Sequence, residues 1–167
     1  MAYLAQLLIG LCTGGVAAWL TAQFALRRFY SEKWWEKRAT AFIVLTDAVY
    51  QVQLAQEYWV LLHESRREGP EEYPNFKELD GPEKAELMEK EKLAMEVITK
   101  FSQVGPLQIT EKASKLLISY LRDVQKAEYD VDFRGWETDE AQAHCLELVR
   151  TLLKDLIKES SESLKAK

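Results

Sequence analysis

Residues 35–63 read WEKRATAFIVLTDAVYQVQLAQEYWVLLH, and this stretch decides the fold class. Its positions follow an unbroken alternation of three and four residues: Trp35, Arg38, Phe42, Leu45, Val49, Val52, Gln56, Trp59 and His63. A second stripe recurs every seven residues beside the first: Trp34, Ala41, Ala48, Ala55 and Leu62. A seam of this width is typical of a helix buried in a bundle. The pattern therefore predicts an all-α fold whose first helix runs to about Arg66.

Three further helices are predicted downstream, over residues 82–104, 110–128 and 138–160. The pair Asp80 and Glu83 forms a capping box, and Gly105 with Pro106 ends that helix. The loop 67–80, the stretch 129–137 and the tail 161–167 are predicted to be irregular. The apolar spacing predicts these inward residues: Leu87, Met88, Ala94, Met95, Ile98, Phe101, Ala113, Leu116, Leu117, Tyr120, Leu121, Val124, Ala141, Cys145, Leu148, Val149, Leu152 and Leu156.

Four amphipathic helices with short links favour an antiparallel four-helix bundle with a long first helix. The bundle is predicted over residues 39–160. No Gly or Pro lies between Val16 and Gly69, so the first helix is free to continue from the N-terminal segment. Facing helices split between two chains give the same periodicity, and this alternative stays open.

The first 26 residues carry no Asp, Glu, Lys or Arg. Residues 3–26 at about 1.5 Å per residue give roughly 36 Å, which crosses an apolar bilayer core of about 30 Å. A signal peptide needs basic residues before its apolar run, and none precedes this one. The sequence predicts a retained transmembrane helix over 1–26.

The segment 27–38 mixes basic and aromatic residues. Five of its residues are basic and two are acidic, which gives a local charge of +3. By the positive-inside rule, the C-terminal domain is cytoplasmic and the N-terminus lies outside. The residues predicted to contact the membrane interface and its anionic headgroups are Arg27, Arg28, Lys33, Trp34, Trp35, Lys37 and Arg38.

Small residues recur every four positions within the predicted span. They are Gly10, Gly14, Ala18 and Ala22. Such spacing lets two helix backbones approach closely, so it predicts a packing face for a second copy or another membrane protein. Gly and Ala are also simply common in membrane helices, which is the plainer interpretation.

The charge distribution limits the kinds of partner that the chain could bind. Outside residues 27–38 the chain has 17 of its 22 basic and 25 of its 27 acidic residues, a charge of −8. An acidic bulk speaks against binding to nucleic acid. Two cysteines, Cys12 and Cys145, fall in different predicted segments, which suits a reducing compartment.

Two clusters on the chain have the residue types of a metal site. Glu140, His144 and Glu147 share one helix face, but a di-iron bundle needs paired Glu-x-x-His motifs on two helices. Asp130 to Gly135 resembles the opening of a calcium loop, but Arg134 stands at its fifth position and Ala141 at its twelfth. We predict no metal site and no cofactor.

No enzyme is predicted either. His144 and Cys145 are adjacent on a helix and point about 100° apart, so they do not form a nucleophile–base pair. No Gly-rich phosphate loop, nucleophile elbow or zinc spacing occurs in the sequence.

The block Tyr30-x-Glu32-Lys33-Trp34-Trp35-Glu36-Lys37-Arg38 resembles the juxtamembrane start of uncharacterised bacterial single-span membrane proteins with a small helical cytoplasmic domain. The resemblance covers about a tenth of the chain. It implies a bacterial inner (cell) membrane and brings no activity and no functional residues with it.

Three functions follow as hypotheses. The first is a membrane-anchored helical interaction protein, a scaffold or accessory subunit without catalytic activity. The second is a membrane effector, a toxin or defence protein whose copies oligomerise and perturb the bilayer. The third is a metal-dependent enzyme that uses the face of Glu140, His144 and Glu147.

Overall fold

The structure is a computed structural model that describes residues 2–69 and 71–165; for residues 2–14 and residue 17 it describes the backbone only. It divides into two units, residues 1–38 and 39–167. The described residues form four α-helices and one short 3₁₀ turn, and they contain no strand. The predicted all-helical class and the helical bundle are therefore confirmed.

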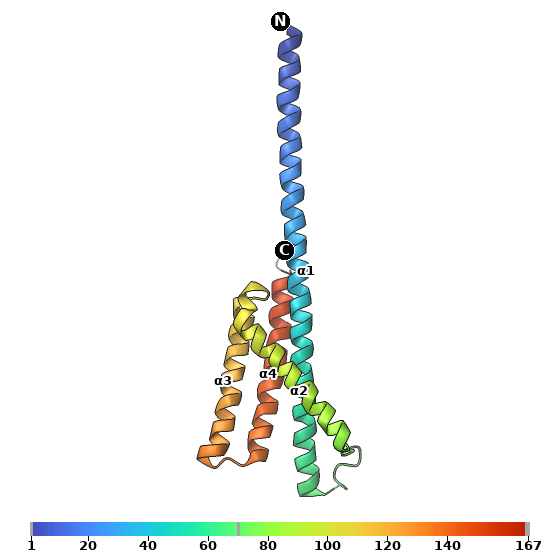
Figure 1. Cartoon of the computed structure of the whole chain (residues 1–167), viewed down its shortest axis with the longest axis vertical. Coiled ribbons are helices and arrows are strands. Elements are labelled where there is room, and N and C mark those ends of the chain that lie inside the picture. The colour runs from blue at the N-terminus through green and yellow to red at the C-terminus, as the bar shows by residue number, and fades with distance from the viewer. Residues whose placement is uncertain (1, 70, 166–167) are drawn as a thin grey trace. The chain divides into compact units, whose positions relative to one another are not determined.

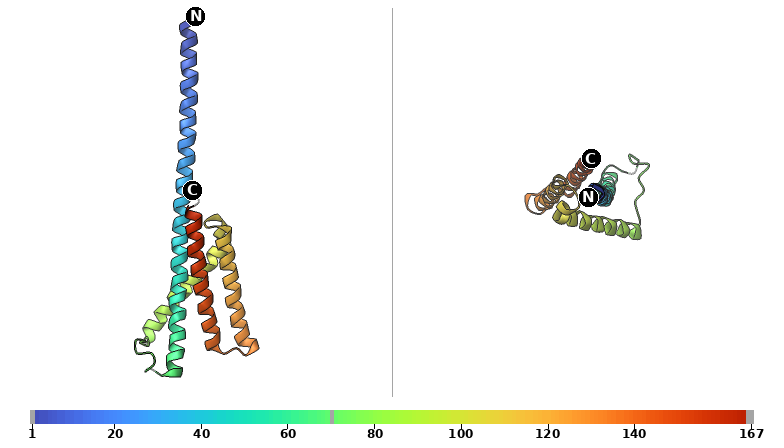
Figure 2. Two further views of the ribbon diagram at one scale, coloured as in Figure 1. Left: turned by 180° about the vertical axis from the view of Figure 1, so that it is seen from behind. Right: turned by 90° about the horizontal axis from the view of Figure 1, so that it is seen from above.

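The helices are α1 (Ala2–Glu68), α2 (Gly81–Val104), α3 (Glu111–Arg134) and α4 (Thr138–Lys165), and the turn η1 (Gly105–Leu107) follows α2. In the second unit, α1 and α3 run in one direction and α2 and α4 in the other (Figures 1 and 2). The helices α3 and α4 lie side by side, whereas α2 crosses the bundle obliquely.

Local side-chain chemistry sets the helix starts as predicted. The Asp80 side chain accepts a hydrogen bond from the Glu83 backbone N–H at 2.9 Å, and the Glu83 carboxylate accepts one from the Asp80 N–H at 2.9 Å. This reciprocal capping box opens α2. The Thr110 hydroxyl accepts from the Ala113 N–H at 3.1 Å and caps α3.

Two segments differ from the prediction. Residues 129–134, predicted as irregular, belong to α3, which ends at Gly135 with φ 74°. The Trp136 N–H donates to the Asp130 carbonyl at 3.2 Å, the long bond that closes a Schellman-type helix end. The helix α4 continues through Lys165, five residues beyond the predicted end.

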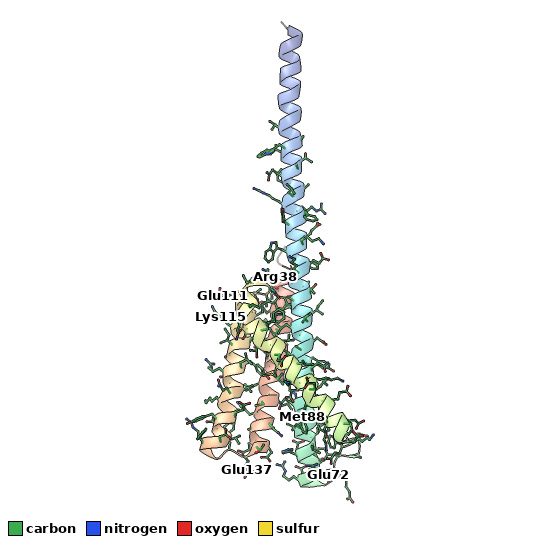
Figure 3. The ribbon with its side chains drawn as sticks, in the orientation of Figure 1. Arg38, Glu72, Met88, Glu111, Lys115 and Glu137 are labelled. Atoms are coloured by element: carbon green, nitrogen blue, oxygen red, sulfur yellow. The ribbon has the colours of Figure 1, made fainter. Side chains whose placement is uncertain are left out.

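The core of the second unit draws on all four helices. Its wholly buried side chains include Leu45 and Val49 of α1, Ile98 of α2, Leu117 of α3 and Leu156 of α4. Most positions of the predicted apolar stripes therefore point inward. Met88 is an exception, 57% exposed on the outer side of α2 (Figure 3). Because α2 crosses obliquely, its first turns do not keep their apolar stripe against the core.

Long-range polar contacts join α1 to its neighbours in the bundle. Arg150 of α4 donates to Glu57 of α1 at 3.1 Å, and Gln56 of α1 donates to Glu91 of α2 at 2.6 Å. Short-range pairs such as Glu111 and Lys115, at 2.7 Å along α3, lie on the outside (Figure 3). Exposed pairs of this kind contribute only about 0.3–0.5 kcal/mol each.

Candidate functional site

The predicted membrane segment lies partly outside the described residues. Gly10 and Gly14 of the packing face belong to the residues whose side chains are not described, and Ala18 and Ala22 are exposed. Within the part of the chain that the structure describes, no helix offers an apolar stretch long enough to cross a membrane. The described side chains of this segment nevertheless expose large apolar groups, with Trp19 at 62% and Phe24 at 67%.

The basic and aromatic segment 27–38 is helical, and its aromatic side chains are exposed. Trp34 is 58% and Trp35 is 42% exposed. Two ion pairs run along the helix: Arg28 to Glu32 at 2.9 Å and Lys33 to Glu36 at 2.8 Å. The Lys33 ammonium lowers the pKa of Glu36, so that carboxylate is charged at neutral pH.

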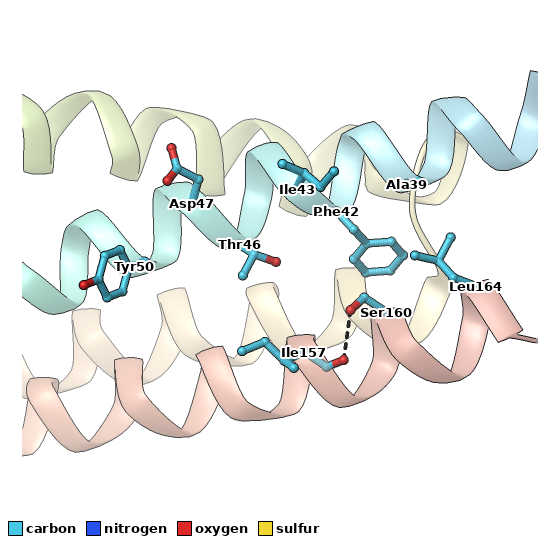
Figure 4. Close-up of a pocket in the computed structure, with 9 residues that line it drawn as sticks. All are labelled: Ala39, Phe42, Ile43, Thr46, Asp47, Tyr50, Ile157, Ser160 and Leu164. Carbon is cyan, nitrogen blue, oxygen red and sulfur yellow. Dashed lines mark hydrogen bonds between the residues drawn. The ribbon is translucent and has the colours of Figure 1, made fainter.

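An apolar groove lies between α1 and α4 in the second unit (Figure 4). Its volume is about 450 Å³. The Phe42 ring points from α1 toward α4, and the Ser160 hydroxyl donates to the Ile157 carbonyl at 2.9 Å beside it. The groove is lined by Ala39, Phe42, Ile43, Thr46, Asp47, Tyr50, Ile157, Ser160 and Leu164. We refer to these residues as the α1/α4 groove.

The rim of the α1/α4 groove is unusually apolar for a surface. Ile43 is 69%, Ile157 is 49% and Tyr50 is 45% exposed. The stripe continues along α1 to Leu54 and Leu61, which line a second pocket of about 520 Å³. Contiguous exposed apolar surface of this kind marks interaction sites on soluble domains. The arrangement suits an amphipathic helix laid along α1.

A polar pocket of about 320 Å³ lies among α1, α2, α3 and α4. Glu91 of α2 lies in it, where burial raises the pKa of its carboxyl group. Hydrogen bonds from the Gln56 amide, at 2.6 Å, and from the Trp59 indole oppose that shift. The carboxylate thus joins α1 to α2 through two donors.

Tyr120 of α3 and Cys145 of α4 line the same pocket. Burial raises the pKa of the Cys145 thiol, and the nearby Glu128 and Glu91 raise it further. The thiol is therefore protonated at neutral pH, a poor state for a nucleophile. Burial also raises the pKa of Tyr120, with Cys145 and Glu91 adding to the shift.

The side chains that could bind a metal do not converge on one point. Glu140, His144 and Glu147 are all exposed on α4. Glu147 pairs with Arg150 at 2.9 Å, and the His144 ring meets the edge of Trp136 at 5.7 Å between ring centres. Among the described side chains, no group of three or more His, Cys, Asp or Glu residues could hold a metal ion.

The stretch that resembles a calcium loop is helical. Asp130 and Asp132 lie within α3, so their backbone does not form the turns of an ion-binding loop. Asp130 is buried, and its carboxylate lies 3.3 Å from Arg134 one turn later. The Asp130 backbone carbonyl, which accepts from the Trp136 N–H, belongs to the C-terminal end of that helix.

A buried carboxylate ties the end of α4 to the start of α3. Glu159 accepts from the Thr110 hydroxyl at 2.8 Å and pairs with the Lys112 ammonium at 2.6 Å. The ammonium, with Thr110 assisting, lowers the pKa of Glu159 below its ordinary value of 4.5, although burial opposes the shift. A carboxylate whose pKa is lower in the folded protein than in the unfolded chain stabilises the fold. This stabilisation is fully present above the unfolded-state pKa and is lost as the pH falls through the folded-state pKa.

We expect Glu159→Gln to lower the free energy of unfolding at pH 7 by about 1 kcal/mol, a value discounted because Lys112 is largely exposed. The deficit shrinks as the pH falls below about 4.5, because this carboxylate becomes protonated in the unfolded chain there and in the folded protein only at lower pH. Urea unfolding of both proteins at pH 7 and pH 3.5 measures this difference in the free energy of unfolding. Glu162→Gln is the control, because Glu162 is exposed and lies 3.5 Å from the same Lys112. A deficit of equal size at both pH values would refute this assignment.

Comparison of the chain with models of protein families, with curated proteins and with solved structures finds no match.

The sequence alone did not reveal the α1/α4 groove or the polar pocket. The exposed positions of α1 do carry a signal, because Ile43, Tyr50 and Leu54 add a second apolar stripe to a helix that already has a complete core seam. The polar pocket has no comparable signal, since its residues come from four separate helices.

Proposed function

We propose that this chain is a membrane-anchored helical interaction protein, a scaffold or accessory subunit without catalytic activity. The observation that carries the proposal is the uncharged N-terminal segment of 26 residues, followed at once by the basic and aromatic segment 27–38. In its described part, Val16, Trp19 and Phe24 are 58%, 62% and 67% exposed. Covering apolar surface with lipid releases about 25 cal/mol for each Å² removed from water.

The direction of the anchor follows from charge. All five basic residues near the segment lie on its C-terminal side, which favours a cytoplasmic second unit and an external N-terminus. The exposed Trp34 and Trp35 suit the headgroup region, where aromatic rings are enriched. A bacterial inner membrane is the proposed location, in keeping with the resemblance of the Tyr30–Arg38 block.

The interaction role rests on the second unit. Its bundle buries a core of its own and still exposes the apolar α1/α4 groove. Half-buried Cys145 is protonated, and the exposed Glu140, His144 and Glu147 do not converge. A partner helix in the α1/α4 groove, or a helix packed on Gly10, Gly14, Ala18 and Ala22, would assemble the complex.

The test is fractionation of cells that express the full chain, with reporters fused at either end. We expect the protein to stay in membranes after an alkaline carbonate wash, with the C-terminal reporter active in the cytoplasm. Recovery in the soluble fraction would refute the anchor.

The mass of the complex purified in mild detergent tests the second half of the proposal. Stoichiometric co-purification of another protein, or a fixed multiple of 19.3 kDa, supports an assembly role. A monomer alone would refute it. Loss of membrane potential on overexpression of such a self-assembled complex would instead favour the membrane effector.

A further inference from the structure

Two pockets that open to the surface meet in the second unit. The polar pocket of about 320 Å³ and a neighbouring one of about 420 Å³ share four lining residues: Gln56, Val124, Glu128 and Cys145. Ligand sites for small molecules typically occupy roughly 300–1,000 Å³. We call the pair the double pocket.

One buried polar atom at the double pocket has no partner among the described residues. The Gln142 Oε1 atom, in the neighbouring pocket, is buried and has no hydrogen-bond partner in the described part of the chain. Tyr120 is only 6% exposed and lines the first pocket beside Glu91 and Cys145. Buried polar atoms without a partner are rare, and each requires an explanation. The Gln142 oxygen accepts only, so its missing partner is a donor.

The charge of the double pocket defines that donor further. Three acids line it, Glu91, Glu128 and Asp132, against one base, Lys92. The lining of the pocket that contains Gln142 includes no basic side chain among the described residues. A cation is attracted to this site, and an anion is repelled.

The remaining walls suit an organic group better than a bare ion. Val124, Val131, Ala127 and Ala141 supply aliphatic surface, and Trp59 and Tyr120 are among the residues that line the first pocket. Aromatic faces attract ammonium groups that have lost part of their water. The described acids do not form a metal-binding group.

We propose that the double pocket binds a small organic ammonium ion with an aliphatic body. The ammonium N–H groups donate to the Gln142 oxygen and the Glu128 carboxylate, and the aliphatic body lies against Val124 and Val131. The Tyr120 hydroxyl receives a hydrogen bond from, or gives one to, the ligand's polar end. This site is independent of the membrane anchor and of the α1/α4 groove.

The test uses the full chain in nanodiscs of phosphatidylcholine, which has no net charge to attract amines. The probe is 1,6-diaminohexane, and the matched uncharged probe is 1,6-hexanediol. Isothermal titration calorimetry at 150 mM salt gives the affinities. We expect saturable binding of one diamine per chain and binding of the diol weaker by about tenfold or more, since hydrogen bonds from charged donors are the stronger ones.

Three variants locate the site. Glu128→Gln and Tyr120→Phe each weaken diamine binding, by about tenfold for the loss of the charged acceptor. Glu128 is exposed at the surface end of the pocket, so its variant folds normally. Glu140→Gln removes the same charge from α4 outside the lining residues and leaves the affinity unchanged.

Several results would overturn the proposal. Equal affinities for the diamine and the diol would show that the pocket does not recognise the ammonium group. Equal weakening by Glu140→Gln and Glu128→Gln would reduce the effect to general attraction by an acidic protein. Absence of binding by either probe would leave the Gln142 oxygen without a ligand donor and refute the site.

Discussion

Leu156→Ala lowers the free energy of unfolding of the bundle by about 3 kcal/mol, the centre of the range for a buried leucine. Leu156 is wholly buried on α4, in the core cluster that also contains Leu45 and Phe42 of α1. Truncation removes the favourable transfer of its side chain from water and leaves a cavity, because helices on both sides hold their positions. Thermal unfolding followed by circular dichroism should show a midpoint lowered by roughly 10 °C.

The neighbouring residue supplies the matched control. Ile157 is 49% exposed on the rim of the α1/α4 groove, so Ile157→Ala should change the free energy of unfolding by about 0.5 kcal/mol or less. The two substitutions fall one residue apart on α4 and remove comparable volume. Equal losses of stability would mean that α4 presents a different face to the core.

Val16→Arg has the second large expected effect, on the proposed anchor. Val16 lies near the middle of residues 3–26, where an arginine costs about 3 kcal/mol of insertion free energy, or roughly a hundredfold in the partition. We expect the variant protein to leave the membrane fraction during an alkaline carbonate wash that wild type survives.

Ser31→Arg adds the same charge within the basic segment 27–38 and serves as the control. We expect it to remain in the membrane fraction, because a cation there lies at the headgroup level. If both variants stay in the membrane fraction, residues 3–26 do not form a span that places Val16 near its middle. Loss of both would indicate peripheral binding that depends on something other than depth in the bilayer.

Sequence reasoning succeeded where the determining interactions are local. The start of α2 follows from Asp80 and Glu83, three residues apart, and the start of α3 from the hydroxyl of Thr110. The core seam of α1 was also predicted, since a 3-4 alternation over residues 35–63 fixes which face is buried once a bundle forms. These signals do not depend on knowing the partner helices.

Local patterns do not predict the ends of two helices or the path of a third. The segment 129–134 has poor helix formers, yet α3 continues through it to Gly135, whose left-handed backbone ends the helix. The tail 161–167 is predicted to be irregular, but α4 continues to Lys165, and Glu159 near its end binds Thr110, 49 residues earlier in the chain. Met88 was placed in the core because the oblique path of α2 is invisible to periodicity.

The candidate site was the least predictable part. The double pocket joins Gln56, Glu91, Tyr120 and Cys145, one residue from each helix of the bundle. Each of these residues has an ordinary sequence context. Only their convergence in space places them around one partly buried carboxylate, so no local pattern could have marked them.

The pairing of α1 with α4 has a consequence for how the protein is made. Glu57 of α1 and Arg150 of α4 meet although 93 residues separate them along the chain. At a synthesis rate of about 5–20 residues per second, α1 waits roughly 5–20 s on the ribosome before α4 is complete. During that interval α4 is not yet there to complete the core around Leu45, Val49 and Val52, so we expect this apolar face to stay partly open until α4 emerges.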